Sequence, residues 1–330
     1  MKIKDIAKEL HLSISTVSKA LNGAFDISEE TKEMVLKYAK EHGYVSRDQR
    51  LRITSMRRLC FLYDNVDASS QANIILPLSS FFSKCARQKN FEVLQCPITD
   101  IKKSYADFMK KNNFDGALIA GLNLKSPLLP ELIETNIPTV LYDNNLEGEK
   151  ISTVCNENIN TFAKIVSYLC ENGHTKIGFI HGDKNSFVSN ERFAGYIIGL
   201  GINNIEYNKE YVYYGRFDEK SGVEAAKYFV ETDVSAIVCV SDVISIGLIK
   251  GLQSLGKRIP EDISVTGYDD LDISNYITPS LTTVHQDLDK IANLSVGLLL
   301  SLMMNRTAQR IVVNGKIIIR NSTGPNVNKE

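Results

Sequence analysis

Several sequence patterns that identify common protein classes are missing from this chain of 330 residues. Its six cysteines include no C-x-x-C pair, and most lie inside apolar runs, so we expect buried free thiols and no disulfide or zinc site. The five histidines lack the spacing of metal ligands, and the chain has neither a P-loop nor a G-x-S-x-G motif. The sequence therefore predicts no enzyme, no cofactor and no bound metal.

Long hydrophobic segments are also missing. The N-terminus carries no apolar signal segment, and the longest apolar run, around residues 298–304, is too short to span a bilayer. We therefore expect a cytoplasmic protein with no membrane contact. The length is sufficient for two or more domains, each with its own core.

The chain as a whole has no large excess of positive or negative charge, because its formal net charge is −1. The charge is unevenly distributed, however. Residues 1–58 contain 12 Lys or Arg and 8 Asp or Glu, which gives +4, whereas the remainder contains 26 against 31, which gives −5. A basic head on an acidic body is expected when only one module meets phosphate, although a chance fluctuation would look the same.

The first 23 residues have the pattern of two short helices joined by a tight turn. Apolar residues at helical spacing predict the first helix: Ile3, Ile6, Ala7 and Leu10. His11 and Leu12 form the turn, and Ser13 is a good N-cap for the second helix. That helix has an inner face made of Val17, Ala20 and Leu21. It directs outward the side chains of Ile14, Ser15, Ser18 and Lys19.

The outward side chains suit DNA. A recognition helix places residues against base edges in the major groove, where Ser donates or accepts, Lys reaches guanine or phosphate, and Ile contacts a thymine methyl. From the pattern alone, a small helical cap without DNA contact is an equal alternative.

A third helix is predicted from its N-cap Ser28 to Gly43, with an apolar face made of Met34, Val35, Tyr38 and Ala39. The following stretch, residues 46–58, contains five arginines and one aspartate. This stretch is either a solvated linker or a linker that lies on DNA and folds there.

From Leu59 onward, short apolar runs alternate with stretches of helical length. The predicted strands are residues 59–63, 91–95, 116–120, 139–142, 176–180, 236–240 and 264–267, and the predicted helices include residues 77–90 and 161–172. This alternation predicts an α/β fold with two doubly wound parallel-sheet lobes. In such lobes, ligands gather at the carboxyl ends of the strands.

The sequence of the first two predicted helices closely resembles that of the headpiece of the lactose-repressor (LacI/GalR) family. The resemblance lies in Lys4-Asp5-Ile6-Ala7 and in residues 12–23, LSISTVSKALNG. His11 departs from the family, which usually has Gly in the turn, but His tolerates a positive φ better than most residues. The resemblance implies base contacts from Ile14, Ser15 and Lys19. It implies phosphate contacts or support of the register from Lys4, Thr16, Ser18 and Asn22.

In that family the linker becomes a hinge helix that enters the minor groove and wedges it open with an apolar side chain. Here Ile53 lies where the wedge leucine is expected, and Arg50 replaces the small residue beside it. Either Ile53 is the wedge, or arginines enter the groove without much kinking.

The order of short motifs along residues 114–286 is similar to the effector-binding core of the family, whose fold resembles periplasmic sugar-binding proteins. The motifs include Glu191-Arg192, Ser241-Asp242, Gly267-Tyr-Asp-Asp270 and Gln286. The resemblance implies a headpiece at 1–45, a basic hinge at 46–58 and a two-lobed core at 59–330. Lobe 1 would comprise about 59–156 plus 286–312, and lobe 2 about 157–285 plus 313–330. The chain ends without the leucine-rich tail that builds tetramers, so we expect a homodimer.

Candidate ligand-binding residues follow from the same resemblance. They are Asp143, Arg192, Phe217, Ser241, Asp242, Asp269 and Gln286, with Tyr63, Asp64 and Asn73 as weaker candidates. Each has a structural alternative: Arg192 could form a surface ion pair with Glu191 or Asp183, Asp242 could cap a helix, and Phe217 could pack in the core.

We therefore expect a DNA-binding transcriptional repressor that binds double-stranded operator DNA and is controlled allosterically by a small, sugar-like ligand in the cleft. The alternatives are a sugar-binding receptor with an incidental helical head and a regulator that responds to a non-sugar ligand or a protein co-effector. An enzyme on the same scaffold is the third, for which no nucleophile, base or metal set is present.

Overall fold

A computed structural model describes residues 3–21, 27–42, 44, 57–64 and 72–326, which divide into one compact unit up to Arg57 and a second from Arg58. The first unit, the headpiece, contains the helices α1 (Ile3–Glu9), α2 (Ile14–Leu21) and α3 (Glu29–Glu41). Its core consists of Ile6, Ala7, Val17, Ala20, Val35 and Ala39. The predicted three-helix head is therefore confirmed.

Local sequence explains where the headpiece helices start. The Ser13 hydroxyl accepts a hydrogen bond from the backbone N–H of Thr16 at 3.0 Å, and Ser28 accepts from Thr31 in the same way at 3.3 Å. His11 adopts the left-handed conformation, with φ of 52°. Met34 was predicted to face the core, but it is 51% exposed, because α3 turns Val35 and Ala39 toward the core, with Tyr38 partly buried beside them.

The second unit begins with a six-stranded sheet, in the order β11-β5-β4-β3-β1-β2. Its strands are β1 (Arg57–Tyr63), β2 (Phe91–Pro97), β3 (Gly116–Ala120), β4 (Thr139–Tyr142), β5 (Ile151–Asn156) and β11 (Arg310–Val313). The pairs β11–β5, β5–β4, β4–β3 and β3–β1 are parallel. Helices α5 (Ala72–Arg87) and α12 (Leu288–Met303) share one apolar cluster with the sheet, and α6 (Tyr105–Lys111) and α7 (Leu129–Ile133) share another.

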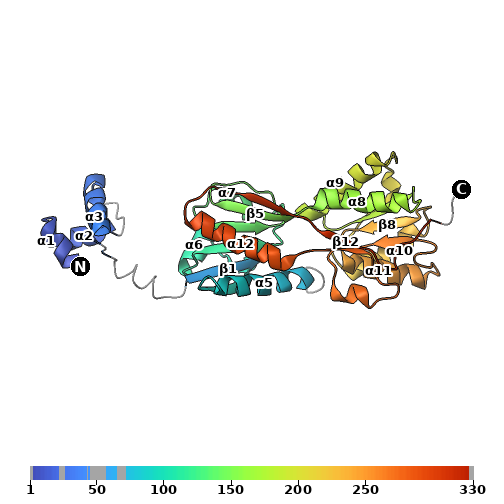
Figure 1. The fold of residues 1–330 in the computed structure, drawn as a ribbon, viewed down its shortest axis with the longest axis horizontal. Coiled ribbons are helices and arrows are strands. Elements are labelled where there is room, and N and C mark those ends of the chain that lie inside the picture. Colours follow the sequence, from blue (N-terminus) through green and yellow to red (C-terminus); the bar gives the residue numbers. More distant parts are fainter. Residues whose placement is uncertain (1–2, 22–26, 43, 45–56, 65–71, 327–330) are drawn as a thin grey trace. The chain divides into compact units, whose positions relative to one another are not determined.

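The other lobe contains a four-stranded parallel sheet in the order β7-β6-β8-β9. Its strands are β6 (Ile177–His181), β7 (Val212–Tyr214), β8 (Ala236–Cys239) and β9 (Ser264–Thr266). Its helices are α8 (Asn158–Glu171), α9 (Phe187–Ile202), α10 (Glu219–Phe229) and α11 (Asp242–Ser254). Figure 1 shows α8 and α9 on one side of this sheet and α10 and α11 on the other. The predicted pair of doubly wound lobes is confirmed.

Three segments cross between the lobes: residues 156–158, 285–288 and 313–316. Beside them, β10 (Thr283–His285) pairs antiparallel with β12 (Lys316–Ile318). The lobes pack closely within themselves because glycines allow their helices to approach. A Cβ on Gly195 of α9 would lie 2.3 Å from the carbonyl oxygen of Ile159 in α8.

Several predicted boundaries need correction. Helix α5 begins at Ala72, five residues before the predicted start at Pro77, so this proline lies inside the helix and not at its first turn. Strand β5 was missed because Ser152 and Thr153 interrupt its apolar pattern, yet it is fully buried between β4 and β11. Residues 57 and 58 belong to β1, although they were predicted to end the basic hinge. The rest of that hinge lies outside the described residues.

Candidate functional site

The headpiece presents one polar face of α2. Ile14 is 46% exposed, and Ser15 and Lys19 are also exposed, while Val17 and Ala20 on the opposite face are buried. Lys4 on α1 is exposed as well. The outward face predicted for the second helix is therefore accessible.

Two of the residues predicted to contact DNA are less exposed than the others, and three lie outside the described residues. Thr16 and Ser18 are half-buried, and the Thr16 hydroxyl lies 2.8 Å from the Ser13 hydroxyl at the helix start. Asn22, Arg50 and Ile53 lie outside the described residues.

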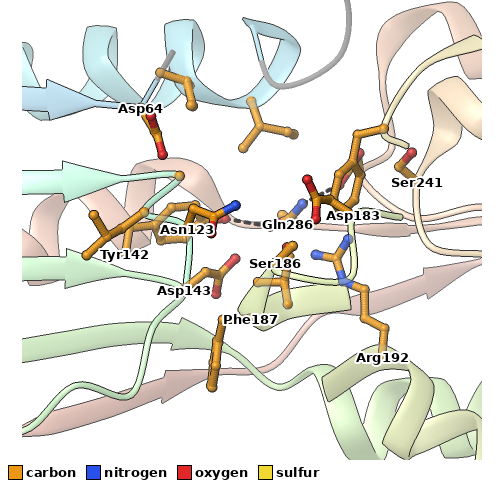
Figure 2. A pocket seen from close by; sticks show the side chains of 17 residues that line it. Asp64, Asn123, Tyr142, Asp143, Asp183, Ser186, Phe187, Arg192, Ser241 and Gln286 are labelled. Carbon is orange, nitrogen blue, oxygen red and sulfur yellow. Dashed lines mark hydrogen bonds between the residues drawn. The ribbon is translucent and has the colours of Figure 1, made fainter. Parts of the chain in front are cut away.

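A cavity of about 360 Å³ lies between the two lobes of the core. It forms where strands of both sheets end, as expected for doubly wound folds. Its polar lining residues come after β1, β3, β4, β6, β8, β9 and β10 and from the cap and first turns of α9: Asp64, Asn123, Asp143, Asp183, Ser186, Arg192, Ser241, Asp269 and Gln286. Figure 2 shows the Asp143 carboxylate and the Arg192 guanidinium directed toward one another across this space.

Arg192 is held rigidly in the second lobe. It is only 3% exposed. Its Nε donates to Asn158 at 3.0 Å, its Nη1 donates to the carbonyl oxygen of Val240 at 2.6 Å, and its guanidinium lies 3.8 Å from the centroid of the Tyr268 ring. A surface ion pair with Glu191 or Asp183 does not fit a guanidinium that is this deeply buried, and Glu191 binds Arg310 and Asn158 instead.

Gln286 connects the lobes where the second crossing segment begins. Its side chain is buried, with 5% exposed. Its Oε1 accepts from the Tyr142 hydroxyl at 2.8 Å and from Asn156 Nδ2 at 2.6 Å, both in the first lobe. Its Nε2 donates to Asp269 Oδ1 in the second lobe at 2.6 Å. We call these four residues and Asp143, to which Asn156 also donates, the hinge network.

The two carboxylates of the hinge network that line the cavity are held in uncommon conformations. Asp143 has φ of 52° and Asp269 has φ of 124°, and the second value is unusual for any residue except glycine. Burial raises the pKa of Asp269 well above its usual range, and the nearby Arg192 offsets this only in part. Burial also raises the pKa of Asp143, against the influence of Arg192 and the hydrogen bonds from Asn156.

The cavity contains six of the seven predicted ligand-binding residues: Asp143, Arg192, Phe217, Ser241, Asp269 and Gln286. Asp242 is the exception and needs correction. It is buried outside the lining, and its carboxylate accepts from the Leu271 N–H and from the hydroxyls of Ser274 and Thr283. These bonds fasten the start of α11 to the segment that follows β9, so the carboxylate has a structural role.

Among the weaker candidates, Asp64 lines the cavity, whereas Asn73 lines a different groove and Tyr63 lines neither. Asn123, Tyr142, Asp183 and Phe187 line the cavity but were not predicted. The rule that ligands meet strand ends could have identified Asn123 and Asp183, because they follow β3 and β6 closely. No signal in the sequence distinguished Phe187 from a core residue.

A second groove runs along one side of both lobes. It is lined by Asn73, Leu76 and Pro77 from the first lobe and by residues of α10, α11 and the 272–275 turn from the second. Large apolar side chains are exposed beside it, including Leu76, Ile273 and Tyr276, the last of which is 82% exposed. Such a patch is typical of an interaction surface.

Within the described ranges, no helix is long and apolar enough to cross a membrane. In the same part of the chain, no group of three or more His, Cys, Asp or Glu side chains could hold a metal ion.

Comparisons with known proteins agree with this architecture. The family model described as "Bacterial regulatory proteins, lacI family" matches residues 2–47, and that of the periplasmic binding protein-like domain matches residues 166–323. The repressor PurR of Photorhabdus laumondii is 30% identical, over 97% of this chain and 96% of its own length. The probable repressor ExuR of Bacillus subtilis is 28% identical, over 97% of each chain. The structure of the transcriptional regulator CelR–cellobiose complex is similar, with a TM-score of 0.74 and 24% identity over 98% of this chain and 99% of the other.

The raised pKa of Asp269 predicts a pH-dependent stability. Because the native state keeps a proton that the unfolded state has already lost, this group's contribution to the free energy of unfolding decreases as pH rises. We therefore expect the stability of the wild type, relative to Asp269→Asn, to increase as pH is lowered from about 7.5 to about 5, toward the ordinary aspartate pKa near 3.9.

Urea unfolding of both proteins over this range measures the difference. Burial lowers the pKa of His174 and His181, which weakens the fold at acid pH, but this effect is common to both proteins and cancels. A difference that stays constant, or that decreases on acidification, would contradict the prediction.

Proposed function

We propose that this chain, which belongs to the lacI family of bacterial regulatory proteins, acts as a DNA-binding transcriptional repressor through helix α2 of its headpiece. The observation that carries the proposal is the accessible polar face of α2 above a buried apolar face. In the proposed complex, α2 lies in the major groove, with Ile14, Ser15 and Lys19 at base edges. Because its target is DNA, we propose that the protein acts in the cytoplasm.

The proposed phosphate contacts surround this helix. Lys4, Thr16, Ser18 and Asn22 would bind phosphates or support the register, and these contacts position the helix without reading sequence. Arg50 and Ile53 would reach the minor groove from the basic hinge, a role that rests on the sequence alone.

The proposed assembly is a homodimer. A pseudo-palindromic operator has two half-sites, which two identical headpieces fit best. The groove beside Leu76, Ile273 and Tyr276 supports this because it exposes large apolar side chains on both lobes of one chain. A rearrangement of the lobes would then change both halves of the interface.

The proposed effector is a small, sugar-like ligand in the cavity between the lobes. Asp143, Asp269 and Arg192 would hydrogen-bond its polar groups, with Ser241 and Gln286 beside them and Phe217 against a ring face. Sugar is also the ligand named for the CelR complex, which shares the fold. A ligand that prefers one arrangement of the lobes changes operator affinity by linkage, and a coupling of about 1–3 kcal/mol corresponds to about 5- to 150-fold.

The DNA-binding role predicts different effects from two exposed lysines of the headpiece. Lys19→Ala on α2 should weaken binding to the operator by about 1–3 kcal/mol, because it removes a contact in the groove. Lys37→Ala on α3, also exposed, is the matched control and should change affinity little.

Gel retardation with a duplex selected by the wild-type protein from random sequences measures both affinities, and thermal unfolding reports the folding of each variant. If both variants lose affinity equally, or if the wild-type protein selects no sequence at low salt, the proposed DNA interface is wrong.

The proposed dimer surface predicts that the double variant Ile273→Ala, Tyr276→Ala dissociates more readily. Losing one exposed aromatic and one aliphatic side chain from an interface should raise the dimer dissociation constant at least about tenfold. Ile202→Ala on α9 removes an equally exposed side chain from another surface and serves as the control. Sedimentation velocity over a concentration series makes the comparison, and a wild-type monomer or equal weakening by the control would contradict this surface.

A further inference from the structure

The charged groups around the cavity are strongly unbalanced. Among the described residues of the lining, four carry a carboxyl group, Asp64, Asp143, Asp183 and Asp269, and Arg192 is the one cation. Their formal charge is −3 when all are ionised and −2 when Asp269 keeps its proton. The carboxylates come from both lobes, and Figure 2 shows three of them, Asp64, Asp143 and Asp183, around the cavity.

Arg192 already has several partners within the protein. Two of the three guanidinium nitrogens of Arg192 bind Asn158 and the Val240 carbonyl oxygen, and the flat face lies on Tyr268. These bonds use two of the five guanidinium N–H groups, so the side-on grip of a carboxylate through Nε and Nη2 is lost. The remaining N–H groups of Arg192 can donate to ligand oxygens such as those of hydroxyls.

Helix N-termini are the other possible source of positive charge, because α9 and α11 both begin at the cavity. Their ends already have partners. Ser186 and Ser241 cap them, Asp183 precedes the cap of α9, and Asp242 is the first residue of α11. These carboxylates compensate the dipoles, so little positive potential remains for an anionic ligand.

The carboxylates retain capacity for hydrogen bonds from a ligand. Asp269 accepts one side-chain bond from Gln286 through Oδ1, and Asp183 accepts one backbone bond from Asn185 through Oδ1. A carboxylate offers about four lone-pair sites. Groups that donate to carboxylates and accept from one arginine are hydroxyls, and ammonium groups also satisfy the carboxylates.

We propose that the effector is a polyhydroxyl compound without a negative charge, and that the cavity excludes sugar acids and sugar phosphates. This inference rests on the proposed function. An anion enclosed here would lie among carboxylates in a partly dry space, where like charges repel strongly. A neutral or amino sugar brings hydrogen-bond donors for these carboxylates. The benzene rings of Phe187 and Phe217 provide apolar faces for the carbon side of a sugar ring.

The test is a panel in which charge alone changes on a common skeleton. Glucose and galactose are each supplied as the free sugar, the 2-amino sugar, the uronate and the 6-phosphate, with cellobiose as a neutral disaccharide. Thermal shift and calorimetry on the full-length protein are expected to show binding of a neutral or amino member. The acid and phosphate of the same skeleton should bind at least about tenfold more weakly, which corresponds to about 1.4 kcal/mol.

Asp183→Asn tests the cause of this discrimination. Asparagine keeps an oxygen for the Asn185 N–H but removes one charge, so the affinity ratio of neutral sugar to uronate should fall several-fold. Glu149→Gln removes an exposed charge elsewhere in the core and should leave the ratio unchanged. An unchanged ratio in Asp183→Asn would overturn the electrostatic explanation.

Two further outcomes overturn the inference. One is a uronate or phosphate that binds as tightly as its neutral counterpart, and the other is a panel in which no neutral or amino sugar binds. Gel retardation with the same protein separates these outcomes from failure of the proposed function. An operator complex that responds to an acid refutes only the charge rule, whereas the absence of any operator complex refutes the repressor itself.

Discussion

The side-chain amide of Gln286 is the interaction on which the arrangement of the core depends. It accepts from Tyr142 and Asn156 in the first lobe and donates to Asp269 in the second, in a place where water does not compete. Buried polar groups are costly when unpaired, so the network favours the one arrangement of lobes that satisfies all of them. Three of these residues, Tyr142, Asp269 and Gln286, also line the cavity.

This construction joins ligand binding to lobe movement without a separate relay. Asp143 and Asp269 belong to the hinge network and also line the cavity. A ligand that donates hydrogen bonds to them competes with or reinforces the bonds from Asn156 and Gln286. The effect on DNA then follows from linkage, because a ligand changes operator affinity only as far as it prefers one arrangement of the lobes. Burial raises the pKa of both carboxyl groups, so their ionised forms are costly here, and a ligand that donates hydrogen bonds to them favours the ionised forms.

Local patterns in the sequence were sufficient for the headpiece and for the fold class. The cap at Ser13 and the apolar spacing around Val17 involve neighbours within one or two turns, and the alternation of strands and helices limits the core to few topologies. Contacts distant in sequence were harder to predict. Asp242 and Asp269 both follow buried strands, yet only the path of residues 271–283 decides that Asp242 is enclosed while Asp269 meets the cavity. Tyr142 looked like an ordinary strand end, and the strand that Asn156 ends was missed. Nothing local marked either residue, because their partner, Gln286, lies at least 130 residues away in the chain.

The most direct test of this account is a double-mutant cycle on the unfolding free energy, with Tyr142→Phe in one lobe and Asp269→Asn in the other. The two side chains bind opposite ends of the same Gln286 amide. If that amide ties the lobes together, the two substitutions should be coupled by about 0.5–3 kcal/mol. Effects that simply add would show that the lobes do not communicate through Gln286 and would contradict the account.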